Sequence, residues 1–361
     1  MKCIRKLTIK SMFVLLLVSM MTPIMVYGST RTRELYYAHA LSRAVRTPEI
    51  VPLDRESRAA AEQARQMHNV FVSMSRSSDC FEAYALYGEI MEARAESAYL
   101  ARMRDRLRVG VEVQLRRQLA TIAGIELNIG LLESTIELNE KILEQTQIRL
   151  QHGVASEMDV REAELALEES IVNLEMLELN LQNERTNLNR HIGQPLTADL
   201  QIIYDVYDIE PVCEEIRSEN SINRQAARDH NLLHWIDQVA IRRHYWQSNL
   251  YNPEEDNRYN RVQHQMASFE RDMAERAAEQ RVRAALYEWD RLIEQQEAIL
   301  TDLASAQAEY ENMHERLEAG FVIPLQVDQM RLALQAQEVR LARHSYEFWI
   351  ARIKVDHPYV R

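Results

Sequence analysis

Apolar residues recur every seven positions through two long stretches of this 361-residue chain, a spacing typical of long helices packed along seams. The first half carries two such runs, at Leu115, Ile122, Ile129, Ile136, Leu143 and Leu150, and at Val160, Leu167, Leu174, Leu181 and Leu188. The second half carries two more, at Val282, Trp289, Gln296, Leu303, Tyr310 and Leu317, and at Val327, Leu334, Leu341, Phe348 and Val355. Gln296 is the polar exception. The pattern predicts an all-α fold of long antiparallel coiled-coil hairpins.

The second half of the chain repeats the first. Aligning Gly153 with Gly320 brings Arg149-Leu150 onto Arg316-Leu317, and the apolar register matches on both sides of the break. We interpret this match as an internal duplication. The predicted organisation is residues 1–28 as a signal peptide, 29–200 as the first helical repeat and 201–361 as the second.

Each run is broken once, at a position suited to a tight turn. Gly153 and Gly320 can adopt the left-handed conformation that ends a helix. Ser156 can cap the following helix, with Asp159 three residues on completing a capping box. Pro324 takes the first helical position in the second unit, where proline costs no hydrogen bond. Continuous helix over 81–152 would measure more than about 100 Å.

The helices after each break carry a second apolar stripe, on nearly the opposite side from the first. Its members are Met158, Leu165, Val172 and Leu179 in one unit, and Leu325, Leu332, Val339, Tyr346 and Ile353 in the other. A helix with two seams has a neighbour on each flank, which favours side-by-side helices that close into a cylinder. Burial inside a thick bundle would give the same pattern.

Composition excludes several other classes of protein. Only 8 Gly and 8 Pro are present, and neither Gly-rich phosphate-binding spacing occurs, which disfavours Rossmann and P-loop enzymes. No catalytic triad or dyad has support, so we predict no enzyme and no cofactor. The formal net charge of −12 is far from a nucleic-acid footprint.

The N-terminus has the pattern of a secretory signal. A basic stretch precedes an apolar core at 12–21, and Val26-Tyr27-Gly28 gives a small-residue cleavage site. Cleavage is the preferred reading and an uncleaved anchor the alternative. No second run of 18 apolar residues follows, so no transmembrane helix is expected beyond it. Export permits a disulfide between Cys80 and Cys213, but nothing in the sequence pairs them.

At the hairpins the residues resemble the TolC-like outer membrane efflux proteins. The resemblance is carried by Arg149-Leu-Gln-His-Gly153 with the helix that follows, by 188–193, and by the second copy from Arg316 onward. It implies a homotrimer whose helices form an α-barrel tunnel, in the cell envelope at the outer membrane or periplasm. A periplasmic adaptor and an inner-membrane transporter would be its partners.

By this resemblance the hairpin tips form the tunnel entrance. Gly153, Ser156, Gly320 and Pro324 would be tip turns, and Asp159 and Gln326 entrance residues. The family often has an acid at the mouth, and Gln326 departs from that pattern in the second copy. Helix capping is the alternative reading of Asp159, and a solvated surface that of Gln326.

The family also places two β-strands of a shared barrel in each half. The available stretches are 70–82 and 246–262, and neither holds two strands of about 9–11 alternating residues. The sequence therefore predicts barrel strands that are short or absent.

Other chemistry has weak support. His230 and His234 have a metal-compatible spacing but no third ligand, so helical surface histidines are the preferred reading and no metal site is predicted. The acidic stretch 254–256 reads as a solvated turn. Nearby aromatic residues could mark a membrane-interface belt or cap the end of a bundle, namely Tyr245, Trp246, Tyr251 and Tyr259.

Two functions follow from this reading. The first is an efflux tunnel component that conducts passively and gates by movement at Gly153 and Gly320. The second is a non-conducting coiled-coil scaffold of the envelope derived from the same family.

Overall fold

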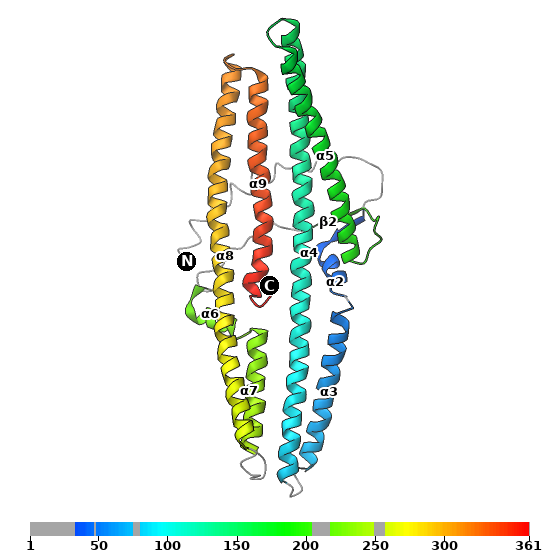
Figure 1. Cartoon of the computed structure of the whole chain (residues 1–361), viewed down its shortest axis with the longest axis vertical. Helices are drawn as coiled ribbons and strands as arrows, with labels where there is room; N and C mark the ends of the chain where they lie inside the picture. The colour runs from blue at the N-terminus through cyan, green and yellow to red at the C-terminus, as the bar shows by residue number, and fades with distance from the viewer. Residues whose placement is uncertain (1–32, 47, 75–79, 204–216, 249–256, 361) are drawn as a thin grey trace. The chain divides into compact units, whose positions relative to one another are not determined.

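The computed structural model describes residues 33–46, 48–74, 80–203, 217–248 and 257–360. Within them the chain forms eight helices and two short strands (Figure 1). The elements are β1 (Arg33–Tyr36), α2 (Tyr37–Ala44), α3 (Ile50–Met74), α4 (Cys80–Gln151), α5 (Glu157–His191), β2 (Leu200–Ile203), α6 (Glu219–Ala226), α7 (His230–Ser248), α8 (Asn257–Glu318) and α9 (Pro324–Asp356). The predicted signal peptide, Cys213, Tyr251 and residues 254–256 lie outside the described residues.

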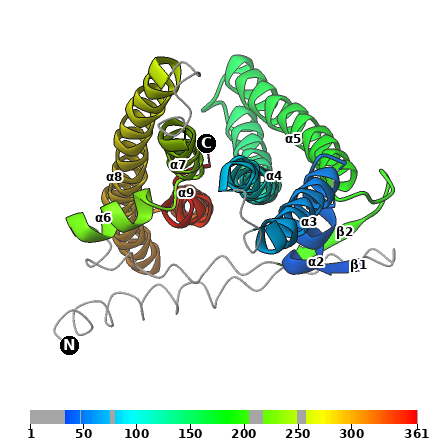
Figure 2. The same cartoon turned by 90° about the horizontal axis from the view of Figure 1, so that it is seen from below.

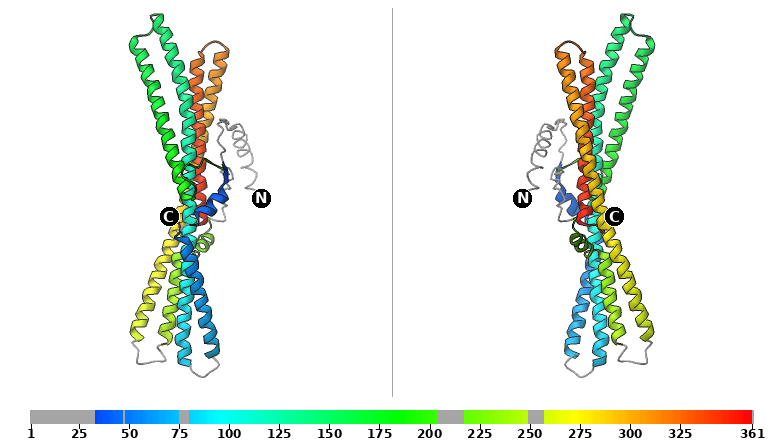
Figure 3. Two further views of the ribbon diagram at one scale, coloured as in Figure 1. Left: turned by 90° about the vertical axis from the view of Figure 1, so that its right-hand side faces the viewer. Right: turned by 90° about the vertical axis from the view of Figure 1, so that its left-hand side faces the viewer.

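The fold is two long helical hairpins, as predicted. The α4 helix runs unbroken for 72 residues, about 108 Å at 1.5 Å per residue, and α8 runs for 62. Neither contains proline, so the backbone hydrogen-bond ladder can continue without a break. The α4/α5 and α8/α9 hairpins point in one direction, and α3 and α7 extend in the other (Figure 3).

The helical unit comprises residues 35–198 and 202–361, and α4 is its central helix. It packs against α3, α5, α7 and α9, while α8 packs against α6, α7 and α9. Toward the hairpin tips the lateral order is therefore α5, α4, α9, α8. Toward the other end it is α3, α4, α7, α8. Figure 2 shows these helices side by side, viewed along their length.

The seven-residue positions of the second half form the main core. Val282, Trp289, Phe348 and Val355 are all buried in one cluster between α8 and α9, with α6 covering it. The Trp289 and Phe348 rings meet edge to face, with centroids 5.0 Å apart. Truncating either ring to alanine would cost about 3–5 kcal/mol, so this cluster holds the second hairpin together.

Polar bonds fix how α4 lies against the helices around it. The Arg116 guanidinium donates to the Trp349 carbonyl at 2.7 Å, to Glu112 at 2.8 Å and to the Tyr37 hydroxyl at 3.1 Å. Burial raises the pKa of Tyr37 to about 12. Nearer the other end Arg102 of α4 pairs with Asp237 of α7 at 2.6 Å. These long-range bonds join the two halves of the chain.

Two features differ from the sequence expectations. β1 and β2 pair as a two-stranded sheet that the helical pattern did not predict, and β2 lies across the predicted repeat boundary at 200/201. By length and composition alone, α4 also contains an 18-residue window apolar enough to cross a membrane. In the described part of the chain, 28% of that window is buried against other residues.

The two stretches considered for barrel strands are helical wherever the structure describes them. The α3 helix continues to Met74 and α4 begins at Cys80, while α7 continues to Ser248 and α8 begins at Asn257.

Candidate functional site

Both hairpin tips are built by a glycine with a left-handed backbone. Gly153 has φ +71° and Gly320 has φ +78°. After α4, Val154 N–H donates to the Arg149 carbonyl at 2.8 Å and Gly153 N–H to the Leu150 carbonyl at 2.9 Å. This pair of bonds is a Schellman motif, which satisfies carbonyls that a helix end leaves unpaired.

The second tip repeats the geometry of the first. Phe321 N–H donates to the Arg316 carbonyl at 2.8 Å, and Gly320 N–H donates to the Leu317 carbonyl at 2.9 Å. The two copies therefore share one backbone device at positions 167 residues apart. Positive φ is strained for side chains with a Cβ, so glycine is what allows both turns to be this sharp.

Asp159 lies in the first tip as part of a capping box. Its carboxylate accepts from Ser156 N–H at 2.7 Å, and the Ser156 hydroxyl accepts from Asp159 N–H at 3.2 Å. The hydrogen bond from the Ser156 backbone, followed by that with its side chain, lowers the pKa of Asp159 below its ordinary value. The side chain is thus ionised at neutral pH and lies at the exposed start of α5.

In the second tip, different residues occupy the start of the helix that follows the turn. Pro324 is the first residue of α9, and the Gln326 side-chain oxygen accepts from Ile323 N–H at 3.3 Å. Gln326 is therefore exposed and also caps the start of α9. The sequence predicted helix capping only for Asp159. At the equivalent positions 159 and 326 the two tips therefore differ by one negative charge.

Large apolar side chains are exposed at both tips. Val154 and Met158 are each 67% exposed, and Phe321 is 77% exposed. Ile323 beside Phe321 is also exposed. Burying such side chains against a partner is favourable by about 1.5–3 kcal/mol each, so the tips offer apolar contact area that the chain itself leaves in water.

The second apolar stripe has different surroundings in the two hairpins. On α9 it is at least partly covered, because α9 lies between α4 and α8, and Ile353 packs against Val109 and Val113 of α4. On α5 it faces water: Met158 is 67%, Leu165 49%, Val172 49% and Leu179 62% exposed. We call these four residues the α5 row. The prediction that the helix after each turn has a neighbour on both flanks therefore holds within the chain for α9. For α5, the outer flank is open in the described part of the chain.

The open edge on the other side of the helical unit is α8. Toward its N-terminal end it carries exposed apolar residues at intervals of three and four, namely Tyr259, Val262, Met266, Phe269 and Met273. One edge of the helical unit is formed by α3 and α5, and the other is formed by α8. Because the two edges have different sequences, each is suited to pack against a surface that differs from itself.

The two histidines of α7 point to different neighbours. The His230 ring stacks on Tyr359 with centroids 4.0 Å apart, and the His234 ring lies 5.0 Å from that of Tyr99. Burial lowers the pKa of both imidazoles. Among the described residues, no group of three or more His, Cys, Asp or Glu is placed to hold a metal ion.

The aromatic residues near the end of α7 and the start of α8 have different surroundings from one another. Tyr245 packs over Gly88 of α4, and burial raises its pKa to about 12. The Trp246 ring lies 5.4 Å from that of His264, and Tyr259 is exposed.

Comparison with known proteins identifies the fold. No family model and no curated protein sequence matches the chain, but solved structures match it over about nine tenths of its length. They are outer membrane channels and related membrane proteins, and the chain therefore has the TolC-like α-helical fold that its hairpin residues suggested.

A membrane protein from Pseudomonas aeruginosa has 14% sequence identity and a TM-score of 0.62, with 90% of each chain covered. The outer membrane protein VceC of Vibrio cholerae has 12% identity and a TM-score of 0.55, covering 89% of this chain and 95% of that one. The CmeC outer membrane channel of Campylobacter jejuni has 11% identity and a TM-score of 0.56, covering 89% and 85%. At these identities the similarity is one of fold.

Proposed function

We propose that this chain is the exported subunit of a trimeric efflux tunnel in the cell envelope. The observation that carries the proposal is the exposed α5 row, in a chain that has the fold of outer membrane channels. The tunnel conducts passively, needs no cofactor and catalyses no reaction. A periplasmic adaptor and an inner-membrane transporter are its proposed partners.

The two open edges support assembly into a ring. The α3/α5 edge and the α8 edge differ in sequence, so copies pair head to tail, and a head-to-tail contact generates a closed ring when the rotation between copies allows it. Packing α5 against α8 of the next copy removes the α5 row from water. Three copies joined in this way enclose a helical tunnel.

The hairpin tips are the proposed entrance and docking surface. Val154, Phe321 and Ile323 provide exposed apolar contacts for an adaptor, and the Schellman turns hold them in place. Asp159 contributes one negative charge per copy at the entrance, and Gln326 contributes none. Movement about Gly153 and Gly320 would open or close the tunnel.

The mass of residues 29–361, measured by light scattering after size exclusion, tests the assembly. A trimer in plain buffer or in detergent is the expected result. Leu165→Glu combined with Leu179→Glu places charges in the α5 row and is expected to give a folded monomer. Leu196→Glu, at an exposed leucine outside that row, is the matched control and should remain trimeric. A monomer or dimer of the unmodified chain in both conditions would overturn the tunnel.

A further inference from the structure

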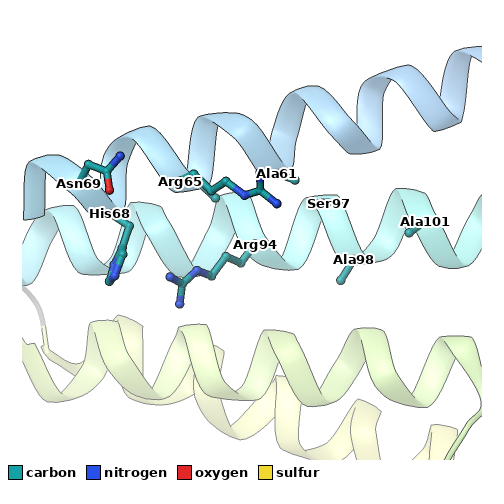
Figure 4. A pocket seen from close by; sticks show the side chains of 9 residues that line it. Ala61, Arg65, His68, Asn69, Arg94, Ser97, Ala98 and Ala101 are labelled. Atoms are coloured by element: carbon teal, nitrogen blue, oxygen red, sulfur yellow. The ribbon is translucent and has the colours of Figure 1, made fainter.

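A groove of about 450 Å³ opens between α3 and α4, far from the hairpin tips (Figure 4). Ala61 and Ala64 of α3, with Ala98 and Ala101 of α4, give it an apolar floor. Its volume lies within the range of about 300–1,000 Å³ typical of small-molecule sites. None of the residues that line it is acidic.

Two arginine side chains and a histidine ring are among the residues that line this groove. Arg94 is exposed and has no carboxylate partner among the described residues. Arg65 reaches only Glu62, at 3.8 Å, which is a long ion pair. The His68 Nδ1 atom is buried and has no hydrogen-bond partner in the described part of the chain. The two guanidinium groups retain unused capacity to bind an anion.

Arg94 and the alanines of α4 occupy successive stretches of the groove, while the Arg65 side chain extends toward Ala61 (Figure 4). In Figure 4 the His68 and Arg94 side chains extend toward the same side of the helix pair, while Ala98 and Ala101 lie farther along α4. Arg94 and Ala101 are seven residues apart, which is about 10 Å along a helix. A ligand that satisfies both ends has an anionic head and a short alkyl tail.

We propose that the α3/α4 groove binds a small anionic amphiphile, with the head held by Arg94 on the side of the groove where His68 lies and the tail lying on the alanine floor. Charge-assisted hydrogen bonds from guanidinium groups suit a carboxylate or a phosphate head. The alanines leave room for the tail that larger apolar side chains would fill. This site is separate from the proposed tunnel entrance.

Calorimetric titration of the whole chain with octanoate, below its micelle concentration, tests the proposal. Acetate has the head without the tail, and 1-octanol has the tail without the charge. Octanoate is expected to bind at least tenfold more tightly than either. Octyl phosphate is titrated alongside octanoate, because a lipid-like phosphate head and a free carboxylate head share the same anionic chemistry. Binding of either ligand supports the site if the Arg94→Gln variant binds it more weakly.

Variants connect the binding to the groove. Arg94→Gln is expected to weaken octanoate binding about tenfold, because it removes a charged donor. Arg55→Gln is the matched control, since Arg55 is exposed on α3 and does not line the groove. Ala98→Leu fills the floor and should abolish binding, with its thermal unfolding checked against the unmodified chain.

Three results would overturn the proposal. They are no binding of either octanoate or octyl phosphate at millimolar concentration, binding of 1-octanol as tight as that of the anionic ligands, and binding of the anionic ligands that Arg94→Gln leaves unchanged.

Discussion

Replacing glycine by alanine is one chemical change, yet the structure predicts opposite effects on stability at Gly320 and Gly130. Gly320 has φ +78° in the second tip, where alanine would enter a left-handed conformation at a cost of about 1–2 kcal/mol. Gly130 lies inside α4, where alanine favours the helix by about 0.5–1 kcal/mol. An added Cβ meets no atom within 4 Å at either position. Backbone conformation is therefore the one difference between them.

A second pair of glycines repeats the comparison in the first hairpin. Gly153 has φ +71°, Gly110 lies inside α4, and an added Cβ again meets nothing within 4 Å at either. Helix content followed by circular dichroism during urea unfolding gives the midpoint and slope for each variant. The tip variants should unfold at lower urea and the helix variants at higher urea than the unmodified chain. The separation within a pair should be about 1.5–3 kcal/mol.

Equal effects of the substitution at Gly320 and Gly130 would refute the left-handed tip. Gly320→Val extends the series, since a β-branched residue resists positive φ more strongly than alanine does. It should be the least stable of the variants and should weaken closure of the second hairpin. A valine variant as stable as the alanine variant would contradict the same reasoning.

Two further predictions concern polar groups. Arg116→Met removes the bonds to the Trp349 carbonyl and to Tyr37, and should lower the free energy of unfolding by about 2–3 kcal/mol, whereas Arg55→Met at an exposed site should leave the thermal midpoint unchanged. Because the pKa of Asp159 is lowered from its ordinary value of 3.8, the ionised carboxylate stabilises the first tip fully at pH values above 3.8. This stabilisation is lost as the pH falls through the lower pKa of the folded state. Asp159→Asn should remove that pH dependence, measured as unfolding midpoints between pH 7 and pH 2.5, and a retained dependence would assign it to another group.

The sequence predicted the hairpins because their signals are local. A glycine that must take positive φ, a serine three residues before an aspartate and a proline at a helix start each act within one turn of backbone. The seven-residue spacing likewise marked Trp289 and Phe348 as seam positions in two separate runs, and the structure buries them together.

Other features left no such signal. The face of α3 that meets α4 is made of small residues, Ser57, Ala60 and Ala64, so no stripe of large apolar side chains announced that contact or the groove beside it. Arg116 looked like any charged residue of a long helix. Its partners on α2 and α9 lie 79 and 233 residues away, and only the packed structure brings them together.

What the sequence by itself determined is which faces of the hairpin helices are apolar and where those helices end at the two tips, since periodicity and capping depend on neighbours along the chain. What only the tertiary structure decided is which apolar faces find a partner. The α5 row and its counterpart on α9 have the same spacing, yet α9 lies between two helices while α5 ends the row of helices. A heptad pattern records that a face prefers burial, but lateral order arises from contacts between segments far apart in sequence. That order leaves the α5 row exposed, and in the proposed trimer a second copy of the chain covers it.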